Sequence, residues 1–161
     1  NDYPELNAEL DTEKDEVVYK EYYDFNVAVD TDNGLLTPLI KNIEDKSIVD
    51  LASEISDKAE RAKERELSPE ELSNGTFSIT NLGVIGGEEF TPIINYPQTA
   101  ILGIGKISDT AEVVNGEVKP RTTVKLSLSY DHRVVDGATG ARFMNEIKEN
   151  LENPEKMLLE M

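Results

Sequence analysis

Apolar residues alternate with polar ones in several short segments, which is the pattern of half-buried β-strands. The first such strand is predicted where apolar side chains occupy every second position, at Tyr23, Phe25, Val27 and Val29. The turn signal Asp32-Asn33-Gly34 follows it, and a second strand is expected over Leu35–Ile40. Pro38 cannot donate to a strand ladder, so this strand is expected to lie at a sheet edge or to bulge there. Val17–Tyr19 predicts a further, short edge strand.

The second half of the chain carries more predicted strands, over Thr76–Thr80, Phe90–Ile94 and Thr99–Ile107. The last of these is apolar enough to be central in a sheet. The pair Asn115-Gly116 marks a two-residue hairpin turn, after which a long strand is expected to end at His132. Its apolar positions are Val124, Leu126, Leu128 and Tyr130. Continuing that alternation by one step places His132 on the apolar face.

One long segment has the spacing of an amphipathic helix, from Ser47 to about Glu66. Ser47 is a natural N-cap, with Asp50 three positions later. The opposite face carries charges of both signs and is expected to be solvated. A capping-box pattern at Ser68–Glu71 predicts one further helical turn.

A second helix is predicted after Gly137, and Asn153-Pro154 is expected to end it. Its apolar stripe consists of Ala141, Phe143, Met144, Ile147 and Leu151. Several strands with two long helices predict an α+β architecture, a mixed sheet with helices packed on one face.

The charge balance is strongly acidic, with 33 Asp and Glu against 16 Lys and Arg and a formal net charge of −17. This balance disfavours nucleic acid or an anionic membrane surface as a partner. It leaves room for an anionic ligand, because a few local donors can overcome the global field. The chain has no cysteine and one histidine, so neither a disulfide nor a metal site is expected. No apolar run has membrane-spanning length.

The single histidine is the clearest candidate for chemistry. His132 is expected at a strand end, and Asp136 follows it by four residues, which suits a general base with an orienting carboxylate. Two plainer interpretations stay open: His132 as a satisfied core residue, and Asp136 as the N-cap of the following helix.

A glycine-rich loop over Asn81–Gly87 follows one of the predicted strands. It lacks the Gly-Lys-Ser/Thr of a P-loop and the spacing of a dinucleotide fingerprint. Its glycines are explained either by a tight turn or by close approach of the backbone to a ligand.

Four motifs in order carry a family resemblance: GTFSITNLGVIGG (Gly75–Gly87), FTPIINYP (Phe90–Pro97), AILGIG (Ala100–Gly105) and DHRVVDG (Asp131–Gly137). Together they resemble the catalytic domain of the dihydrolipoamide acyltransferases, the E2 components of 2-oxo acid dehydrogenase complexes. The last motif contains the HxxxDG pattern shared with chloramphenicol acetyltransferase. The resemblance extends over essentially the whole chain, and it implies a chloramphenicol acetyltransferase-like fold, a two-layer mixed β-sheet with helices on one face.

The resemblance implies acyl transfer between dihydrolipoamide and coenzyme A, with acetyl as the favoured acyl group. It makes His132 the base that deprotonates the attacking thiol, and Thr80 the hydroxyl donor for the oxyanion. Asp136 matches the family aspartate, with either an electrostatic or a structural role. Asn81 and Gly83 are assigned to the channel for coenzyme A and lipoamide. Without the resemblance, Thr80 reads as an ordinary strand residue.

Residues 1–161 are interpreted as an E2 catalytic domain that lacks its N-terminal segment, because residues 1–10 resemble the end of a helix and a loop inside that domain. The lipoyl domain, which carries the lipoyl group, and the peripheral-subunit-binding domain are expected to be absent from this chain. The family assembles as homotrimers into a large hollow core and binds the E1 and E3 components through those upstream domains. A cytoplasmic location is expected in a prokaryote, or the mitochondrial matrix in a eukaryote.

The resemblance also implies that an apolar C-terminal tail, with Met157, Leu158, Leu159 and Met161, docks onto a neighbouring trimer. It further implies that the active site lies between two subunits. Since 52 residues separate Thr80 from His132, the sequence alone also permits a site within one chain.

Three alternatives to an acetyltransferase stay open. The first is a branched-chain acyl or succinyl transferase of the same family. The second is a non-catalytic E2-like scaffold. The third is a hydrolase, which would need a nucleophilic serine such as Ser127 or Ser129 near His132.

Overall fold

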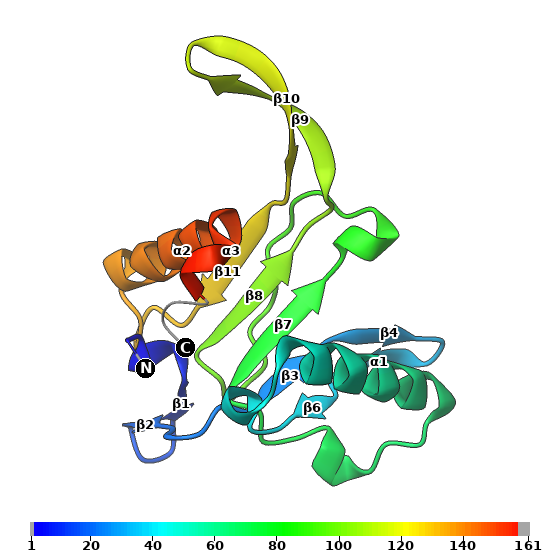
Figure 1. Cartoon of the computed structure of the whole chain (residues 1–161). Coiled ribbons are helices and arrows are strands. Elements are labelled where there is room, and N and C mark those ends of the chain that lie inside the picture. The colour runs from blue at the N-terminus through cyan, green and yellow to red at the C-terminus, as the bar shows by residue number, and fades with distance from the viewer. Residues whose placement is uncertain (1, 158–161) are drawn as a thin grey trace.

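The computed structural model describes residues 2–157 and is built around a mixed five-stranded sheet. The strands lie in the spatial order β11 (Leu126–Tyr130), β8 (Ala100–Ile104), β7 (Phe77–Asn81), β3 (Phe25–Val27) and β6 (Leu39–Ile40) (Figure 1). β3, β7 and β8 are parallel to one another, whereas β11 and β6 run antiparallel at the two edges. The predicted mixed sheet is thus confirmed, and the strand predicted over Thr99–Ile107 is the inner strand β8.

Three antiparallel hairpins surround this sheet. They are β1 (Ala8–Asp11) with β2 (Glu16–Tyr19), β4 (Val29–Thr31) with β5 (Gly34–Leu36), and β9 (Ser108–Val114) with β10 (Glu117–Thr123). The predicted turn at Asn115-Gly116 joins β9 to β10, and both residues have positive φ, as a type I′ turn requires. Figure 1 shows the β9–β10 hairpin projecting away from the rest of the molecule.

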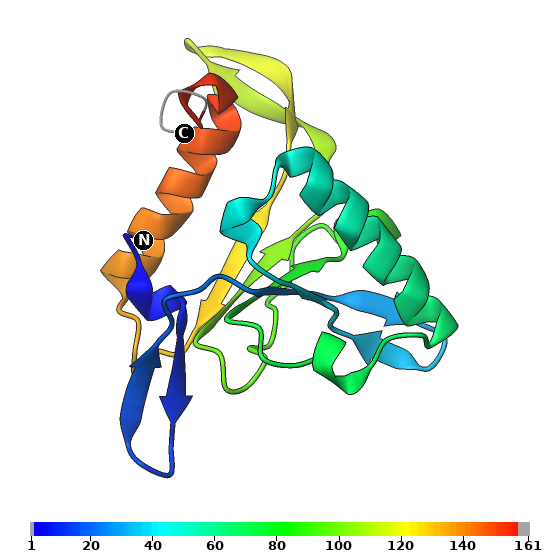
Figure 2. The same cartoon turned by 60° about the horizontal axis from the view of Figure 1, so that its bottom comes forward.

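The helices are α1 (Ile48–Glu64), α2 (Gly137–Glu152) and the short α3 (Pro154–Met157). Four 3-10 turns accompany them within residues 2–157, namely η1 (Pro4–Leu6), η2 (Ile43–Asp45), η3 (Pro69–Glu71) and η4 (Gly83–Ile85). The capping boxes predicted at Ser47 and Ser68 are both present, and α2 ends just before Asn153-Pro154 as expected. Figures 1 and 2 show α1 and α2 on the same side of the sheet.

The main core lies between the sheet and α2. Its buried residues are Leu6, Phe77, Ala100, Leu102 and Val135. From α2, Phe143, Met144 and Ile147 pack against them, and the Phe77 and Phe143 rings meet edge to face with centroids 6.2 Å apart. Val135 is fully buried, so it anchors the segment between β11 and α2 to this core.

The other face of the sheet is covered by the loop over residues 87–97. A methyl group at Gly103 would lie 2.9 Å from the Phe90 ring and 3.3 Å from Pro92, so glycine is needed at this crossing. The strand predicted over Phe90–Ile94 was therefore wrong. This segment is rich in aromatic and β-branched residues, but it crosses the sheet face instead of pairing with a strand, and Pro92 has no N–H to donate.

Two further predictions were wrong in their boundaries. The strand predicted through Val29 divides into β3 and β4, because the chain changes partners: β3 pairs with β6 and β7, whereas β4 pairs with β5. The long strand predicted to end at His132 divides into β10 and β11 for the same reason. Leu35–Ile40 is interrupted around Pro38, as predicted, and β6 lies at the sheet edge.

The N-terminal residues also differ from their interpretation as the end of a helix and a loop. They form η1 and then β1, which pairs with β2 from Ala8 opposite Tyr19 to Asp11 opposite Glu16. The predicted edge strand at Val17–Tyr19 is therefore part of a hairpin. Residues 158–161 of the apolar tail lie outside the described residues.

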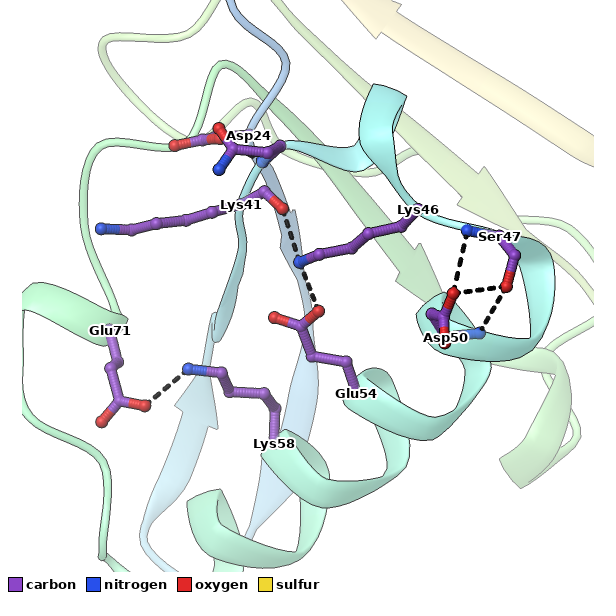
Figure 3. A network of polar contacts seen from close by, with 9 residues as sticks. Asp24, Lys41, Lys46, Ser47, Asp50, Glu54, Lys58 and Glu71 are labelled. Atoms are coloured by element: carbon purple, nitrogen blue, oxygen red, sulfur yellow. Dashed lines mark hydrogen bonds and ion pairs between the residues drawn. The ribbon is translucent and has the colours of Figure 1, made fainter.

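A carboxylate on η3 ties that turn to α1. Glu71 accepts hydrogen bonds from Lys58 (2.5 Å) and Arg61 (2.9 Å) of the helix, and from the backbone N–H of Ser68 (3.1 Å). Figure 3 shows the bond to Lys58 beside the Lys46–Glu54 pair and the Ser47–Asp50 cap. The hydrogen bonds from Arg61 and then Lys58 lower the pKa of Glu71 to about 2, from an ordinary value of 4.5.

We expect Glu71→Gln to lower the midpoint of thermal unfolding at pH 7. A carboxyl with a lowered folded-state pKa stabilises the fold above its ordinary pKa of 4.5, and this contribution is lost as the pH falls from there towards about 2. The difference between wild type and variant should therefore shrink over that range. Thermal unfolding monitored by circular dichroism at several pH values measures it. Glu60→Gln, at an exposed position on α1, is the control; equal shifts for both variants would contradict the prediction.

Candidate active site

The single histidine lies on a turn, not on a strand. β11 ends at Tyr130, and residues 131–136 lead from it into α2. His132 is exposed, and its ring centroid is 5.6 Å from that of Tyr130. The prediction that His132 continues the apolar face of the strand was wrong, as was the plainer interpretation of a buried core histidine. The strand pattern breaks because Val134 and Val135 donate their N–H groups back to the Asp131 carbonyl.

The proposed orienting carboxylate serves as a helix cap. Asp136 is the N-cap of α2, and its Oδ1 accepts the backbone N–H of Thr139 at 2.7 Å. This hydrogen bond keeps the pKa of Asp136 below its ordinary value. Within residues 2–157, Asp136 makes no hydrogen bond to His132. The capping role left open by the sequence is thus observed, and an electrostatic role stays a prediction.

Thr80 lies near the end of β7 and is half-buried. On the same strand, Phe77 belongs to the core beneath α2 and Ile79 packs against that core. Because successive side chains of a strand point to opposite faces, the Thr80 side chain lies on the other face of the sheet. There it is opposite Gly103, on the face that the loop over residues 87–97 covers.

The register of the sheet separates Thr80 from His132 within one chain. Tyr130 pairs with Ala100 at the start of β8, whereas Thr80 pairs with Gly103 near its end. Counted to Tyr130, the last residue of β11, the positions differ by about three residues along the strands and two strands across, or roughly 14 Å in all, and the turn that carries His132 follows Tyr130. Figure 1 shows the same relation, with the arrowheads of β7 and β8 at one end of the sheet and that of β11 at the other.

The glycine-rich loop begins with a local hydrogen bond and a close packing contact. Asn81 Oδ1 accepts the backbone N–H of Gly83 at 3.0 Å. A methyl group at Gly83 would lie 2.3 Å from the Gly105 carbonyl oxygen, so the loop packs directly on the backbone that follows β8. This contact accounts for Gly83 as a packing requirement. The assignment of Asn81 and Gly83 to a ligand channel stays a prediction.

The described residues do not form the other sites considered from the sequence, namely a serine–histidine pair, a metal site or a membrane span. Neither Ser127 nor Ser129 hydrogen-bonds to His132 in the described chain, so a serine–histidine pair is not assembled. Within residues 2–157, no group of three His, Cys, Asp or Glu side chains could hold a metal ion. No helix in that range is long and apolar enough to cross a bilayer.

One feature of the turn escaped the sequence analysis. Asp131 and Arg133, which flank His132, form an ion pair with each other at 2.6 Å. Opposite charges on either side of a lone histidine were the available signal. The pattern alone does not say whether these side chains pair with each other or with distant partners.

Comparison with known proteins gives one consistent family. The profile described as 2-oxoacid dehydrogenases acyltransferase (catalytic domain) matches residues 1–159. The chain is 46% identical over 158 residues to the dihydrolipoyllysine-residue acetyltransferase component of the pyruvate dehydrogenase complex of Staphylococcus epidermidis, and 44% identical to that of Bacillus subtilis. These matches cover 98% of this chain and 36% of each relative, so the chain spans about a third of their length.

Solved structures agree with this match. The chain superposes on the Azotobacter vinelandii dihydrolipoamide acetyltransferase with a TM-score of 0.91 and 41% identity, over 97% of this chain and 64% of that one. In that enzyme a serine, a histidine and an asparagine have been investigated for their roles in catalysis; the histidine follows the serine by 52 residues and precedes the asparagine by four.

A second solved structure supports the same assignment. It is the truncated catalytic core of the 2-oxoacid dehydrogenase complex of Thermoplasma acidophilum, with a TM-score of 0.85 and 45% identity, over 94% of this chain and 67% of that one. The expected fold is thereby confirmed, and the chain belongs to the family of 2-oxoacid dehydrogenase acyltransferase catalytic domains.

Proposed function

We propose that this chain is the catalytic core of a dihydrolipoamide acetyltransferase, which moves an acetyl group between dihydrolipoamide and coenzyme A. One observation carries the proposal. Thr80, His132 and Asp136 have the same separations, 52 and four residues, as the serine, histidine and asparagine of the Azotobacter enzyme. Threonine retains the hydroxyl of serine, and aspartate retains an acceptor oxygen of asparagine.

The chemistry needs no nucleophile from the protein, because both substrates supply sulfur. His132 accepts the proton of the coenzyme A thiol, and the thiolate forms a bond to the carbonyl carbon of the acetyl thioester. The carbonyl electrons then move onto oxygen. When the tetrahedral intermediate collapses, the carbon–sulfur bond to dihydrolipoamide breaks, and the departing thiolate takes the proton back from the imidazolium. The same proton is removed and later returned, so the reaction requires one base. A single histidine therefore suffices in a chain without cysteine.

The Thr80 hydroxyl would stabilise the intermediate by donating a hydrogen bond to its oxyanion. Its neighbours favour this role, because Thr80 lies at the end of a strand held on both sides, by β3 and β8, which fixes its position. A donor fixed in advance needs little reorganisation when charge develops. In the described chain no hydrogen bond of the Thr80 hydroxyl competes with this use.

The sheet register favours an active site shared between two copies of the chain. The separation of roughly 14 Å between Thr80 and the end of β11, from which His132 follows, is too large for one thioester carbon to be reached by both residues of one chain. A second copy can bring its His132 to the Thr80 of the first. A heterologous contact of this kind closes as a ring, which agrees with the homotrimer implied by the family resemblance.

The β9–β10 hairpin supports association with further copies. Val113 and Val118 are directly opposite on one face of the ribbon, and they are 71% and 72% exposed. Ala111 and Pro120, the next pair on that face, are exposed as well. An isolated two-stranded ribbon is marginal in water, so this apolar face requires a covering surface. A homologous structure forms the cubic core of a pyruvate dehydrogenase complex, which makes other copies of the chain the natural partner.

The acyl group and the wider complex are further parts of the proposal. Acetyl is favoured over branched-chain acyl or succinyl groups because the relatives at 44–46% identity are acetyltransferase components. Attachment of the E1 and E3 components would use lipoyl and subunit-binding domains outside these residues. Turnover with a panel of acyl-dihydrolipoamides and coenzyme A distinguishes the acyl groups. An assembled particle that turns over none of them would indicate the non-catalytic scaffold.

We expect His132→Ala to lower turnover by about two to four powers of ten, because it removes the general base. The fold should persist, since the side chain is exposed and its ring lies at the surface beside that of Tyr130. Coenzyme A-dependent acetyl transfer and circular dichroism measure the two effects. His132→Gln, which keeps polar atoms without a titrating imidazole, should be equally inactive. Near-normal turnover by either folded variant would exclude His132 as the base.

A mixing experiment tests the shared site. Thr80→Val, which keeps the β-branched shape but removes the hydroxyl, and His132→Ala are each expected to be of low activity. When both are co-expressed in equal amounts, an intact His132 from one copy can meet an intact Thr80 of its neighbour. Random mixing gives roughly a quarter of the sites both groups, so activity should recover to about that fraction.

If both groups acted within one chain, every chain in the mixture would still lack one of them. Activity would then equal the average of the two variants. That result, with mixed oligomers verified by native mass spectrometry, would exclude the shared site. Thr80→Ser is the control that retains the hydroxyl and should stay active without mixing.

A further inference from the structure

The residues on either side of His132 are bonded to each other. Asp131 Oδ1 accepts hydrogen bonds from the backbone N–H of Arg133 at 3.0 Å and from its Nε at 2.9 Å. Asp131 Oδ2 accepts one from Arg133 Nη2 at 2.6 Å. This two-point contact matches the fork of a guanidinium to both oxygens of a carboxylate. The imidazole therefore projects from a turn whose flanking charges are already paired.

Asp131 is also fixed through its backbone. Its N–H donates to the Thr99 carbonyl at 2.8 Å, and its own carbonyl accepts from Val134 at 3.0 Å and Val135 at 2.9 Å. Every polar group of Asp131 thus forms a hydrogen bond. The backbone groups bond to Thr99, Val134 and Val135, and the carboxylate bonds to Arg133.

The exposure of the pair indicates what it does not do. The Arg133 side chain is 65% exposed and that of Asp131 is 18% exposed. An ion pair this open to water contributes little to the free energy of unfolding. We therefore expect the ion pair to affect the neighbouring side chain of His132 more than the free energy of unfolding.

We propose that Asp131 and Arg133 are positioning residues for His132: the guanidinium neutralises the Asp131 carboxylate and holds it away from the adjacent imidazole, which leaves the ring free to take a proton from a thiol. The inference rests on the proposed function of His132 as the base. It assigns a role to two side chains that would act through His132.

The physical reason is the effect of an unpaired carboxylate beside an imidazole. Such a carboxylate stabilises the imidazolium and hydrogen-bonds to it, and an imidazolium cannot accept a proton from a thiol. Arg133 prevents this by engaging both carboxylate oxygens. In keeping with that geometry, its side-chain hydrogen bonds hold the pKa of Asp131 below the ordinary value, so the carboxylate stays charged and bound to the guanidinium.

Further titratable groups lie near the ion pair, the imidazole or the helix cap. Tyr130 on β11 contacts the imidazole ring, and Tyr96 on the covering loop lies close enough to Arg133 to interact with its charge. On α2, Asp136 is engaged at the helix cap, with Arg142 near it. These groups are unchanged in the variants below, so they contribute equally to each measurement.

The single histidine makes a direct test possible without an activity assay. Diethyl pyrocarbonate acylates the unprotonated imidazole, and in this chain the histidine signal in the ultraviolet comes from His132 alone. The pH at which its reaction rate is half-maximal should rise by about half to one pH unit in Arg133→Ala, because an unpaired negative charge is left nearby. It should fall in Asp131→Asn, which leaves the positive charge unpaired. The double variant should lie between the two.

Two further variants separate charge from geometry. Arg133→Lys keeps the charge but loses the two-point fork, so its pH midpoint should stay near wild type while turnover is only partly retained. Lys14→Ala is the control, because Lys14 forms an ion pair of similar exposure with Asp11 at 3.0 Å in the β1–β2 hairpin, with side chains 69% and 28% exposed. That control should change neither quantity.

The activity measurement completes the test. Arg133→Ala should lower kcat about two- to threefold at pH 7 with little change in KM, because a larger share of the imidazole is then protonated, and raising the pH should restore much of the loss. Identical pH midpoints for wild type, Arg133→Ala and Asp131→Asn, all folded by circular dichroism, would overturn the proposal.

If the midpoints shift as expected but wild type transfers no acyl group, the positioning stands and the proposed function fails. If Arg133→Ala does not fold, Asp131→Asn and Arg133→Lys decide the sign of the shift.

Discussion

The mixed pairing of β8 determines where chemistry can occur in this molecule. β8 is parallel to β7 and antiparallel to β11, so the chain leaves β7 and β11 at opposite ends of the same sheet. Thr80 is placed near one end by this register and His132 just beyond the other. Neither residue can be moved towards the other without changing the register, which would turn each buried side chain to the wrong face. Under the proposed function, therefore, catalysis requires assembly, and the fold itself imposes that requirement.

Assembly of so acidic a chain must depend on apolar contacts. Copies that each carry a formal charge of −17 repel one another at long range. The surface offered by the β9–β10 hairpin suits this situation, because its exposed face joins Val113 to Val118 and Ala111 to Pro120, none of which is charged. Association through such a face gains from removing apolar surface from water, and salt that screens the repulsion should favour it. Acidic residues then keep the remainder of the surface solvated.

The predictions from sequence succeeded where the determinant is local. The Ser47–Asp50 capping box and the Asn115-Gly116 turn involve residues within four positions of one another, and both are present. The errors occur where the partner is distant. Phe90–Ile94 has the aromatic and β-branched composition of a strand, but its place over Gly103 is decided by another element. His132 was expected on the apolar face, and it is not there because the chain turns at Asp131. The family resemblance selected the candidate residues, whereas their separation became visible only from the register.

The two aspartates nearest to His132 in sequence are both committed to structure. Asp131 is bound to Arg133, and Asp136 caps α2 through Thr139. Neither carboxylate hydrogen-bonds to the imidazole within residues 2–157, and the ring lies beside that of Tyr130. Under the proposed function, the exposed imidazole would find its further partners in a substrate thiol or in another copy of the chain. The sheet register leads to the same requirement on independent grounds, since it places the Thr80 hydroxyl out of reach.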